Sequence, residues 1–238
     1  AGAVLLPADS RRFWTDAVFQ SDRVGHAVIT DNQSLRGVLA RLLHAVDPGL
    51  PWLVVAVAVG VLGLSAAVAA ALAGQRRLPH APAWAALACA VTALLVSPVS
   101  WSHHWVWCVP LTLLLGAEAV RRGRARWWAL TGLAALLFCS YALWWVPHSP
   151  GADVPPELRQ SAAQMLLSAV YPAAGLGFLA LTAAVALRAL RKPAPYEPGE
   201  GPGRLPATGR NSQTAPRQGV PGQSAPGRTV PDQAVAKE

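Results

Sequence analysis

Charged residues are scarce in this chain of 238 residues. They make up 13% of it, against 53% hydrophobic residues, a composition too apolar for an ordinary soluble domain. The scarcity is also uneven, because residues 78–117 contain no Asp, Glu, Lys or Arg at all. A single helix of that length would be about 60 Å long, roughly twice the hydrocarbon thickness of a bilayer. The missing charge therefore argues against a water-soluble fold, and it requires this run to turn back on itself.

Cysteine is also rare. The chain has three, Cys89, Cys108 and Cys139, and all of them lie in apolar runs. An odd number of thiols in apolar helices is typical of small core residues and not of a disulfide framework. Their spacing does not suggest a metal site, so we expect neither a disulfide nor a bound metal.

Five apolar runs are long enough, or nearly so, to cross a bilayer: residues 52–74, 78–97, 104–120, 127–146 and 164–187. The predicted fold class is therefore an all-α polytopic membrane protein with about five transmembrane helices.

Small residues spaced by four predict close helix packing; they are Gly63, Ala67 and Ala71 in one run and Ala173 and Gly177 in another. Tryptophans near the ends of the runs are expected at the membrane interface; they are Trp52, Trp84, Trp127, Trp128, Trp144 and Trp145.

The net charge of +8 does not indicate nucleic-acid binding, because the basic residues form short clusters and not one patch. The clusters lie at residues 76–77, 121–126 and 188–192, each after an apolar run. By the positive-inside rule all three are cytoplasmic, which places the turn at residues 97–104 outside. We therefore predict a multi-pass protein of the cell membrane, with membrane lipids and not nucleic acid as its surroundings.

The sequence divides into three parts. Residues 1–51 are predicted to be an extracytoplasmic segment, in which residues 34–46 form an amphipathic helix on the membrane surface or over the bundle. Residues 52–192 are predicted to form the transmembrane helical bundle. Residues 193–238 are rich in Pro and Gly and are predicted to be a disordered cytoplasmic tail. Because the chain starts without Met on what resembles the last turns of a helix, we expect it to be the C-terminal part of a longer protein.

The run SPVSWSHHW, residues 97–105, interrupts the longest uncharged stretch. Non-helical backbone near membrane depth survives only where it is buried in protein or lines a wet cavity. His103 and His104, beside Ser100 and Trp101, therefore indicate a site. Two interpretations of the histidines stay open: they cap a helix that starts near His104, or they donate to an anionic ligand at that helix N-terminus. A metal site is disfavoured, because adjacent helical positions point about 100° apart.

The helix at 34–46 carries Arg36 and Arg41 on its polar face. These arginines either face lipid headgroups or pair with a phosphate, whose geometry suits the guanidinium fork. Asn32 and Ser34 are explained as caps of this helix. None of the carboxylates before residue 52 is marked by the sequence as a general base.

Residues 97–105 resemble the signature of actinobacterial glycosyltransferase family 87. The likeness extends over about residues 5–190 and is reinforced by Arg12-Phe13-Trp14, by residues 31–37 and by the basic loop at 121–126. It implies a GT-C-type multi-helix bundle and a polyprenyl-phosphate-mannose-dependent α-(1→2) mannosyltransferase. Such an enzyme transfers mannose, with inversion, from a lipid phosphate to a glycolipid or glycan hydroxyl outside the cytoplasmic membrane.

Carried over by position, the resemblance assigns His103 and His104 to the donor phosphate or the bound sugar. It places further substrate-binding residues in the same cavity: Trp101, Ser100, Asn32, Gln33 and Arg36. The catalytic carboxylate is expected upstream of Ala1, so the catalytic residue is unknown. No cofactor is implied, because the lipid-linked sugar is the donor substrate.

Two other functions compete with the transferase. A broken helix at membrane depth is also typical of secondary transporters, but the sequence shows no second broken helix and no charged coupling group in mid-span. A non-catalytic membrane scaffold with a disordered tail would leave the cluster at residues 97–104 unexplained. An outer-loop Asp shortly after a first upstream span would favour the transferase.

Overall fold

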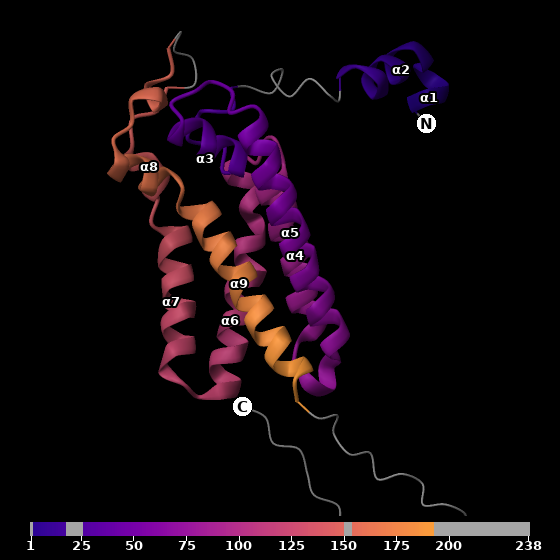
Figure 1. Ribbon diagram of the computed structural model, residues 1–238, viewed down its shortest axis with the longest axis vertical. Helices are drawn as coiled ribbons and strands as arrows, with labels where there is room; N and C mark the ends of the chain where they lie inside the picture. Colours follow the sequence, from indigo (N-terminus) through magenta and orange to yellow (C-terminus); the bar gives the residue numbers. More distant parts are fainter. Residues whose placement is uncertain (1, 18–25, 150–153, 193–238) are drawn as a thin grey trace, which may run out of the picture. The chain divides into compact units, whose positions relative to one another are not determined.

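The computed structural model describes residues 2–17, 26–149 and 154–192 (Figure 1), and the predicted tail at 193–238 lies outside the described residues. Across these three ranges the chain is mostly helical and forms no strand, apart from one isolated bridge between Asn32 and Trp101. The predicted all-α fold class is therefore confirmed.

Five helices of the described chain coincide with the five predicted apolar runs: α4 (Leu50–Arg77), α5 (Ala81–Val96), α6 (Cys108–Arg122), α7 (Ala125–Cys139) and α9 (Val170–Leu190). In the described ranges, α4 and α9 alone are both long and apolar enough to cross a membrane. Helices α5 and α7 are apolar but shorter. The structure thus supports an α-helical membrane protein with two candidate spans.

Three of the predicted runs are interrupted. In the run at 127–146, helix α7 ends at Cys139, and Ala142–Trp145 form the separate 3₁₀-helix η4. Helix α6 begins at Cys108, because Ser102–Trp107 form the 3₁₀-helix η3. The run at 164–187 is divided at Ala169, where the backbone (φ −108°, ψ 12°) leaves the α-helical region, into α8 (Ala162–Ser168) and α9. Helices α6 and α9 therefore each begin next to backbone that is not α-helical, at the same end of the bundle (Figure 1).

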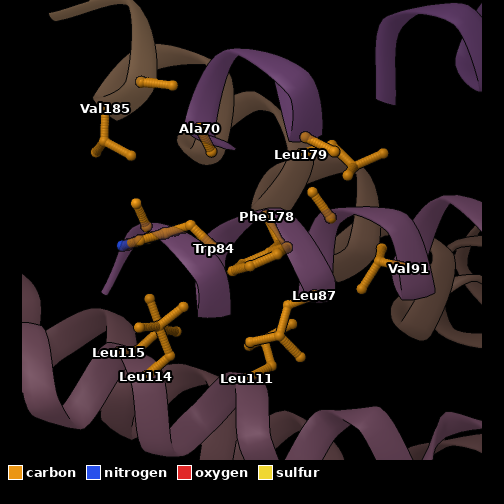
Figure 2. Close-up of a cluster of buried hydrophobic side chains, with 14 of the residues drawn as sticks. Ala70, Trp84, Leu87, Val91, Leu111, Leu114, Leu115, Phe178, Leu179 and Val185 are labelled. Atoms are coloured by element: carbon orange, nitrogen blue, oxygen red, sulfur yellow. The ribbon is translucent and has the colours of Figure 1, made fainter. Parts of the chain in front are cut away.

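The bundle core surrounds Trp84 of α5 (Figure 2). Its side chain is fully buried and stacks on Phe178 of α9, with ring centroids 5.5 Å apart and an interplanar angle of 8°. Trp127 of α7 is also buried and meets Trp84 edge-on at 6.4 Å. The interfacial position predicted for these two tryptophans is therefore wrong: their large apolar surfaces hold three helices together. Of the six tryptophans predicted at the interface, Trp128, Trp144 and Trp145 are more than half exposed.

The outer faces of the helices are apolar. Large hydrophobic side chains that are more than half exposed include Val57, Val61, Leu62, Leu72, Leu113, Leu133 and Leu136. Exposed apolar surface on this scale is typical of contact with lipid or another protein.

Cys89 and Cys139 are also exposed, so the prediction that all three cysteines are core residues is wrong.

Helices α4 and α5 approach closely at Gly63, as predicted, and Ala67 is buried as well. The prediction is wrong for Ala71, which is exposed. A Cβ atom on Gly63 would lie 2.1 Å from Oγ1 of Thr92, so only glycine fits at this contact. The corresponding prediction for α9 is wrong, because Ala173 and Gly177 are exposed. The close approach in α9 is at Gly175, where an added Cβ would lie 2.9 Å from the Trp105 ring.

Replacing Gly63 by valine is expected to push α4 away from α5 and to lower stability by about 1–3 kcal/mol, the usual cost of overpacking. The matched control is Gly177→Val, since nothing lies within 4 Å of a Cβ there. Thermal unfolding in detergent should show a clear loss of Tm for the first variant and little change for the second. Equal melting temperatures would contradict the packing described.

Candidate functional site

Two segments that the sequence marked as parts of a site meet at one end of the bundle. The turn that follows α5 lies against residues 31–34, where the backbone amide of Gln33 donates to the backbone carbonyl of Ser100 at 2.7 Å. The Ser102 amide donates to the Asp31 carbonyl at 2.9 Å. These bonds flank the isolated bridge between Asn32 and Trp101, so two irregular stretches far apart in sequence pair like short strands.

Asn32 is the centre of this junction and is fully buried. Its Oδ1 accepts hydrogen bonds from the amides of Ser100 (3.0 Å) and Ser34 (3.3 Å). Its Nδ2 donates to the carbonyls of Ala27 (3.1 Å) and Pro98 (3.3 Å). Two donors and two acceptor sites are all that an asparagine side chain offers, so the amide is saturated by the protein itself.

A third segment, residues 157–168, completes the junction. The side chain of Gln33, also fully buried, donates through Nε2 to the carbonyls of Thr30 and Ser168, both at 2.7 Å. The buried Glu157 accepts from the Thr30 amide at 3.3 Å through Oε1. Sequence reasoning missed this segment. The available signal was a single carboxylate directly after two prolines, which is too weak to mark a structural role.

Helix α3 (Leu35–Leu42) lies directly on the junction. The predicted cap is confirmed, because Ser34 Oγ accepts from the Gly37 amide at 3.2 Å. A Cβ on Gly37 would lie 2.3 Å from the Asn32 carbonyl oxygen, so glycine permits the contact. The helix is shorter than the predicted 34–46, and its polar face is the buried one, while Leu42 and Leu43 are half exposed.

Arg41 fastens α3 to the junction. Its guanidinium is 1% exposed and donates to the carbonyls of Ile29 (2.9 Å), Asn32 (3.3 Å) and Ser168 (3.2 Å). Burial lowers the pKa of this arginine to about 10, and the charge of Glu157 partly opposes that shift. Both predictions for Arg41, a lipid headgroup or a phosphate partner, are therefore wrong in this structure.

Arg36 has a different environment. It donates to Asp47 at 3.2 Å and lies over the Trp52 ring, 5.4 Å from its centroid. An ion pair and a cation–π contact of this kind tie α3 to the start of α4. Arg36 does not line the hollow between the end of α5 and η3 in whose wall His103 and His104 lie.

The histidines line a hollow of about 510 Å³ between the end of α5 and η3. His103 and His104 are exposed, with ring centroids 4.6 Å apart and planes at 79°. Ser100 lines the same hollow; its hydroxyl is buried and has no hydrogen-bond partner among the described residues. The rest of the wall is mainly apolar: Ala90, Ala93, Leu94, Val99, Val106 and Trp107.

The predicted site residues thus fall into groups. Ser100, His103 and His104 share the hollow, whereas Asn32 and Gln33 are fully buried behind the turn. Trp101 is half-buried and bridges to Asn32 without lining the hollow. Asn32 and Gln33 do not reach the surface, so their geometry is that of a framework and not of direct ligands.

The expected helix N-terminus at His104 is not found, because both histidines lie in η3 and α6 starts at Cys108. An anion in the hollow would therefore be held by imidazole and hydroxyl donors and not by an α-helix dipole. Across the described residues, no group of three or more His, Cys, Asp or Glu side chains is placed to hold a metal ion.

A helical bundle with two membrane-length apolar helices and a histidine-lined hollow at one end defines an integral membrane protein with a polar site beside an apolar wall. Residues 1–98 match glycosyltransferase family 87, and this match together with relatives that are 34–36% identical over more than two thirds of the chain shows that the chain belongs to this family. The match ends before His103 and His104, so it confirms the family without including the histidines.

Curated relatives extend the similarity. The chain is 36% identical over 168 residues to a polyprenol-phosphate-mannose-dependent alpha-(1-2)-phosphatidylinositol mannoside mannosyltransferase of Mycolicibacterium smegmatis, covering 69% of this chain and 36% of that protein. It is 34% identical over 164 residues to the Mycobacterium tuberculosis protein of the same name, and this alignment covers 68% of this chain and 35% of that protein. A polyprenol-phosphate-mannose-dependent alpha-(1-2)-phosphatidylinositol pentamannoside mannosyltransferase of M. smegmatis is 36% identical over 148 residues. This alignment covers 58% of this chain and 34% of that protein.

The chain spans about a third of the length of these curated relatives. No solved structure matches it.

Replacing Asn32 by alanine is expected to leave the backbone amides of Ser100 and Ser34 without the acceptor that they share, Asn32 Oδ1. Each unsatisfied buried group costs about 1–3 kcal/mol, so the turn should loosen and the protein should melt at a lower temperature. Limited proteolysis at residues 98–102 and thermal unfolding measure the two effects. The control is Thr15→Ala, which removes an exposed hydroxyl bonded to the Arg11 carbonyl; if Asn32→Ala behaves like it, Asn32 is not the link described.

Proposed function

We propose that the protein is a membrane mannosyltransferase that takes mannose from a polyprenyl-phosphate donor and transfers it, with inversion, to a glycolipid such as a phosphatidylinositol mannoside. Family membership and the names of the relatives support this function over a transporter or a scaffold. The observation that carries it is the hollow in which two exposed imidazoles and an unpartnered serine hydroxyl adjoin an apolar wall.

The hollow suits the donor because a polyprenyl phosphate is itself half anionic and half apolar. Glycosyl transfer requires stabilisation of the negative charge that develops on the departing phosphate. The ring N–H groups of His103 and His104 are exposed donors of the right type, and Ser100, in the wall of the same hollow, adds a buried hydroxyl without a partner among the described residues. The wall formed by Ala90, Ala93 and other residues of α5 would accommodate the first isoprene units.

The buried junction then has a positioning role. Asn32 holds the Ser100 amide and the Pro98 carbonyl, so it fixes the turn from which Ser100 points. Gln33 binds the Ser100 carbonyl through its own amide and reaches the segment at Ser168 through its side chain. Preorganised donors are effective in catalysis because they need no reorganisation when the charge develops.

The acceptor hydroxyl needs a general base. No carboxylate lines the hollow, so within the described residues the base is not identified. The proposal therefore assigns the binding of the leaving group, and not the activation of the acceptor, to this part of the chain.

We further propose that α4, α5, α6, α7 and α9 are five membrane spans of a GT-C-type bundle, with residues 52–192 in the membrane region and the hollow on the extracytoplasmic side. Three basic clusters of the described chain lie where α6 turns into α7 and where α4 and α9 end, at the opposite end of these helices from α3 and η3 (Figure 1). Basic residues of this kind favour the cytoplasmic side.

Replacing His103 and His104 singly by alanine in the complete gene product should reduce mannose transfer for at least one of them. Loss of one charge-stabilising donor is expected to lower the rate about 10²–10³-fold, with membrane insertion and melting temperature unchanged. The assay is transfer from a polyprenyl-phosphate-mannose donor in membranes, normalised to the amount of folded protein.

The matched control is His80→Asn, which removes another exposed histidine, from the N-cap of α5, and inserts a residue that tolerates the same backbone conformation. It should retain wild-type specific activity. If both His→Ala variants also retain it, the donor-binding role of this pair is excluded.

The topology is tested with single cysteines in a cysteine-free background. A cysteine at Ser102 should react with a membrane-impermeant thiol reagent in intact cells, whereas one at Arg124 should react only after permeabilisation, because the basic loop is expected inside. Labelling of position 124 from outside would overturn this orientation.

A further inference from the structure

A second cavity, of about 390 Å³, lies where α6 turns into α7 and where α9 ends, at the other end of the bundle from the hollow (Figure 1). Seven cationic side chains line it, and no acidic one does: Arg77, Arg121, Arg122, Arg124, Arg126, Arg188 and Lys192. They come from three places in the chain: the end of α4, the α6–α7 hairpin and the end of α9.

The described protein neutralises little of this charge. Arg121 and Arg122 both pair with the buried carboxylate of Glu118, so one negative charge serves two cations. The other five cations have no hydrogen-bond or ion-pair partner within the described ranges. Like charges brought to one cavity repel each other, and a bound anion would remove that repulsion.

The cavity also has an apolar wall between α7 and α9. It is formed by Leu130 of α7 and by Leu181, Ala184 and Val185 of α9. Trp127 lines the same wall, beneath the guanidinium of Arg122, which lies 4.5 Å from the ring centroid. A free phosphate ion would use the cationic rim and leave this wall without a partner.

We propose that this cavity binds the phosphate headgroup of an anionic membrane phospholipid, with an acyl chain along the α7–α9 wall. Basic pockets between transmembrane helices are suited to anionic headgroups, and the planar arginine fork binds phosphate oxygens in pairs. The site is separate from the hollow and does not depend on the proposed transferase activity.

A general preference of basic residues for one side of the membrane would also gather arginines at this end. The two explanations differ in which arginines matter. A surface effect depends on the number of charges at this end, whereas a binding site depends on those that line the cavity. Arg76 and Arg191 provide the comparison, because they are at the ends of the same helices, α4 and α9, and do not line it.

The experiment measures phospholipid binding to the full purified chain in detergent by native mass spectrometry, with phosphatidylglycerol and phosphatidylcholine as probes. The double variant Arg126→Gln/Arg188→Gln should weaken phosphatidylglycerol binding at least about tenfold, since each cation near an anionic lipid contributes to affinity. The matched control, Arg76→Gln/Arg191→Gln, removes the same charge and should weaken it less than about threefold. Phosphatidylcholine should bind weakly to all three proteins.

A second variant, Ala184→Phe, tests the wall without changing any charge. It should weaken phosphatidylglycerol binding and leave the weak binding of inorganic phosphate unchanged. Equal losses in the two double variants would show a surface charge effect, and no loss in either would show that the cavity is not a lipid site. Inorganic phosphate that displaces the lipid at equal concentration would identify a free phosphate as the occupant. Any of these three results would overturn the proposal.

Discussion

The organisation of this protein depends on the need to satisfy backbone polar groups where helices break at the end of an apolar bundle. Unpaired amides and carbonyls are costly when they are buried, and three irregular segments meet there. A single fully buried side-chain amide, that of Asn32, makes four hydrogen bonds, two within its own segment and two to the turn after α5. Together with the backbone bonds from Gln33 to Ser100 and from Ser102 to Asp31, it holds that turn against the segment that leads into α3.

Gln33 and Arg41 solve the same problem for the third segment. Both donate to the carbonyl of Ser168, where the chain enters α9, and Glu157 provides a carboxylate near the buried guanidinium. A buried charge is tolerated only when it is paired and hydrogen-bonded. Of the residues that the resemblance assigned to substrate, Asn32 and Gln33 are fully buried in this junction, whereas Ser100, His103 and His104 line the hollow.

What the sequence predicted well is what local physics determines. The positions of the helices follow from long apolar runs, the break follows from Pro98 and its polar neighbours, and the cap at Ser34 follows from a short-range pattern. What it did not predict involves partners far along the chain. Arg41 and Ser168 are 127 positions apart, and no periodicity in a single sequence reports such a pair. The amphipathic helix illustrates the limit: its apolar stripe was visible, but Gly37 and Arg41 decide that the other face is buried.

The same reasoning explains why arginines at the two ends of the bundle differ. Arg41 is surrounded by carbonyl oxygens and a carboxylate, so its charge is compensated within the protein. Arg126 and Arg188 line a cavity whose described walls offer only apolar and cationic side chains. Helix C-termini at that end carry partial negative charge, but they are too few to balance seven cations. Arg41 therefore has its hydrogen-bond acceptors within the protein, whereas five of the cations that line the cavity at the other end have no such partner among the described residues. In a membrane the most abundant source of an anion for them is the lipid itself.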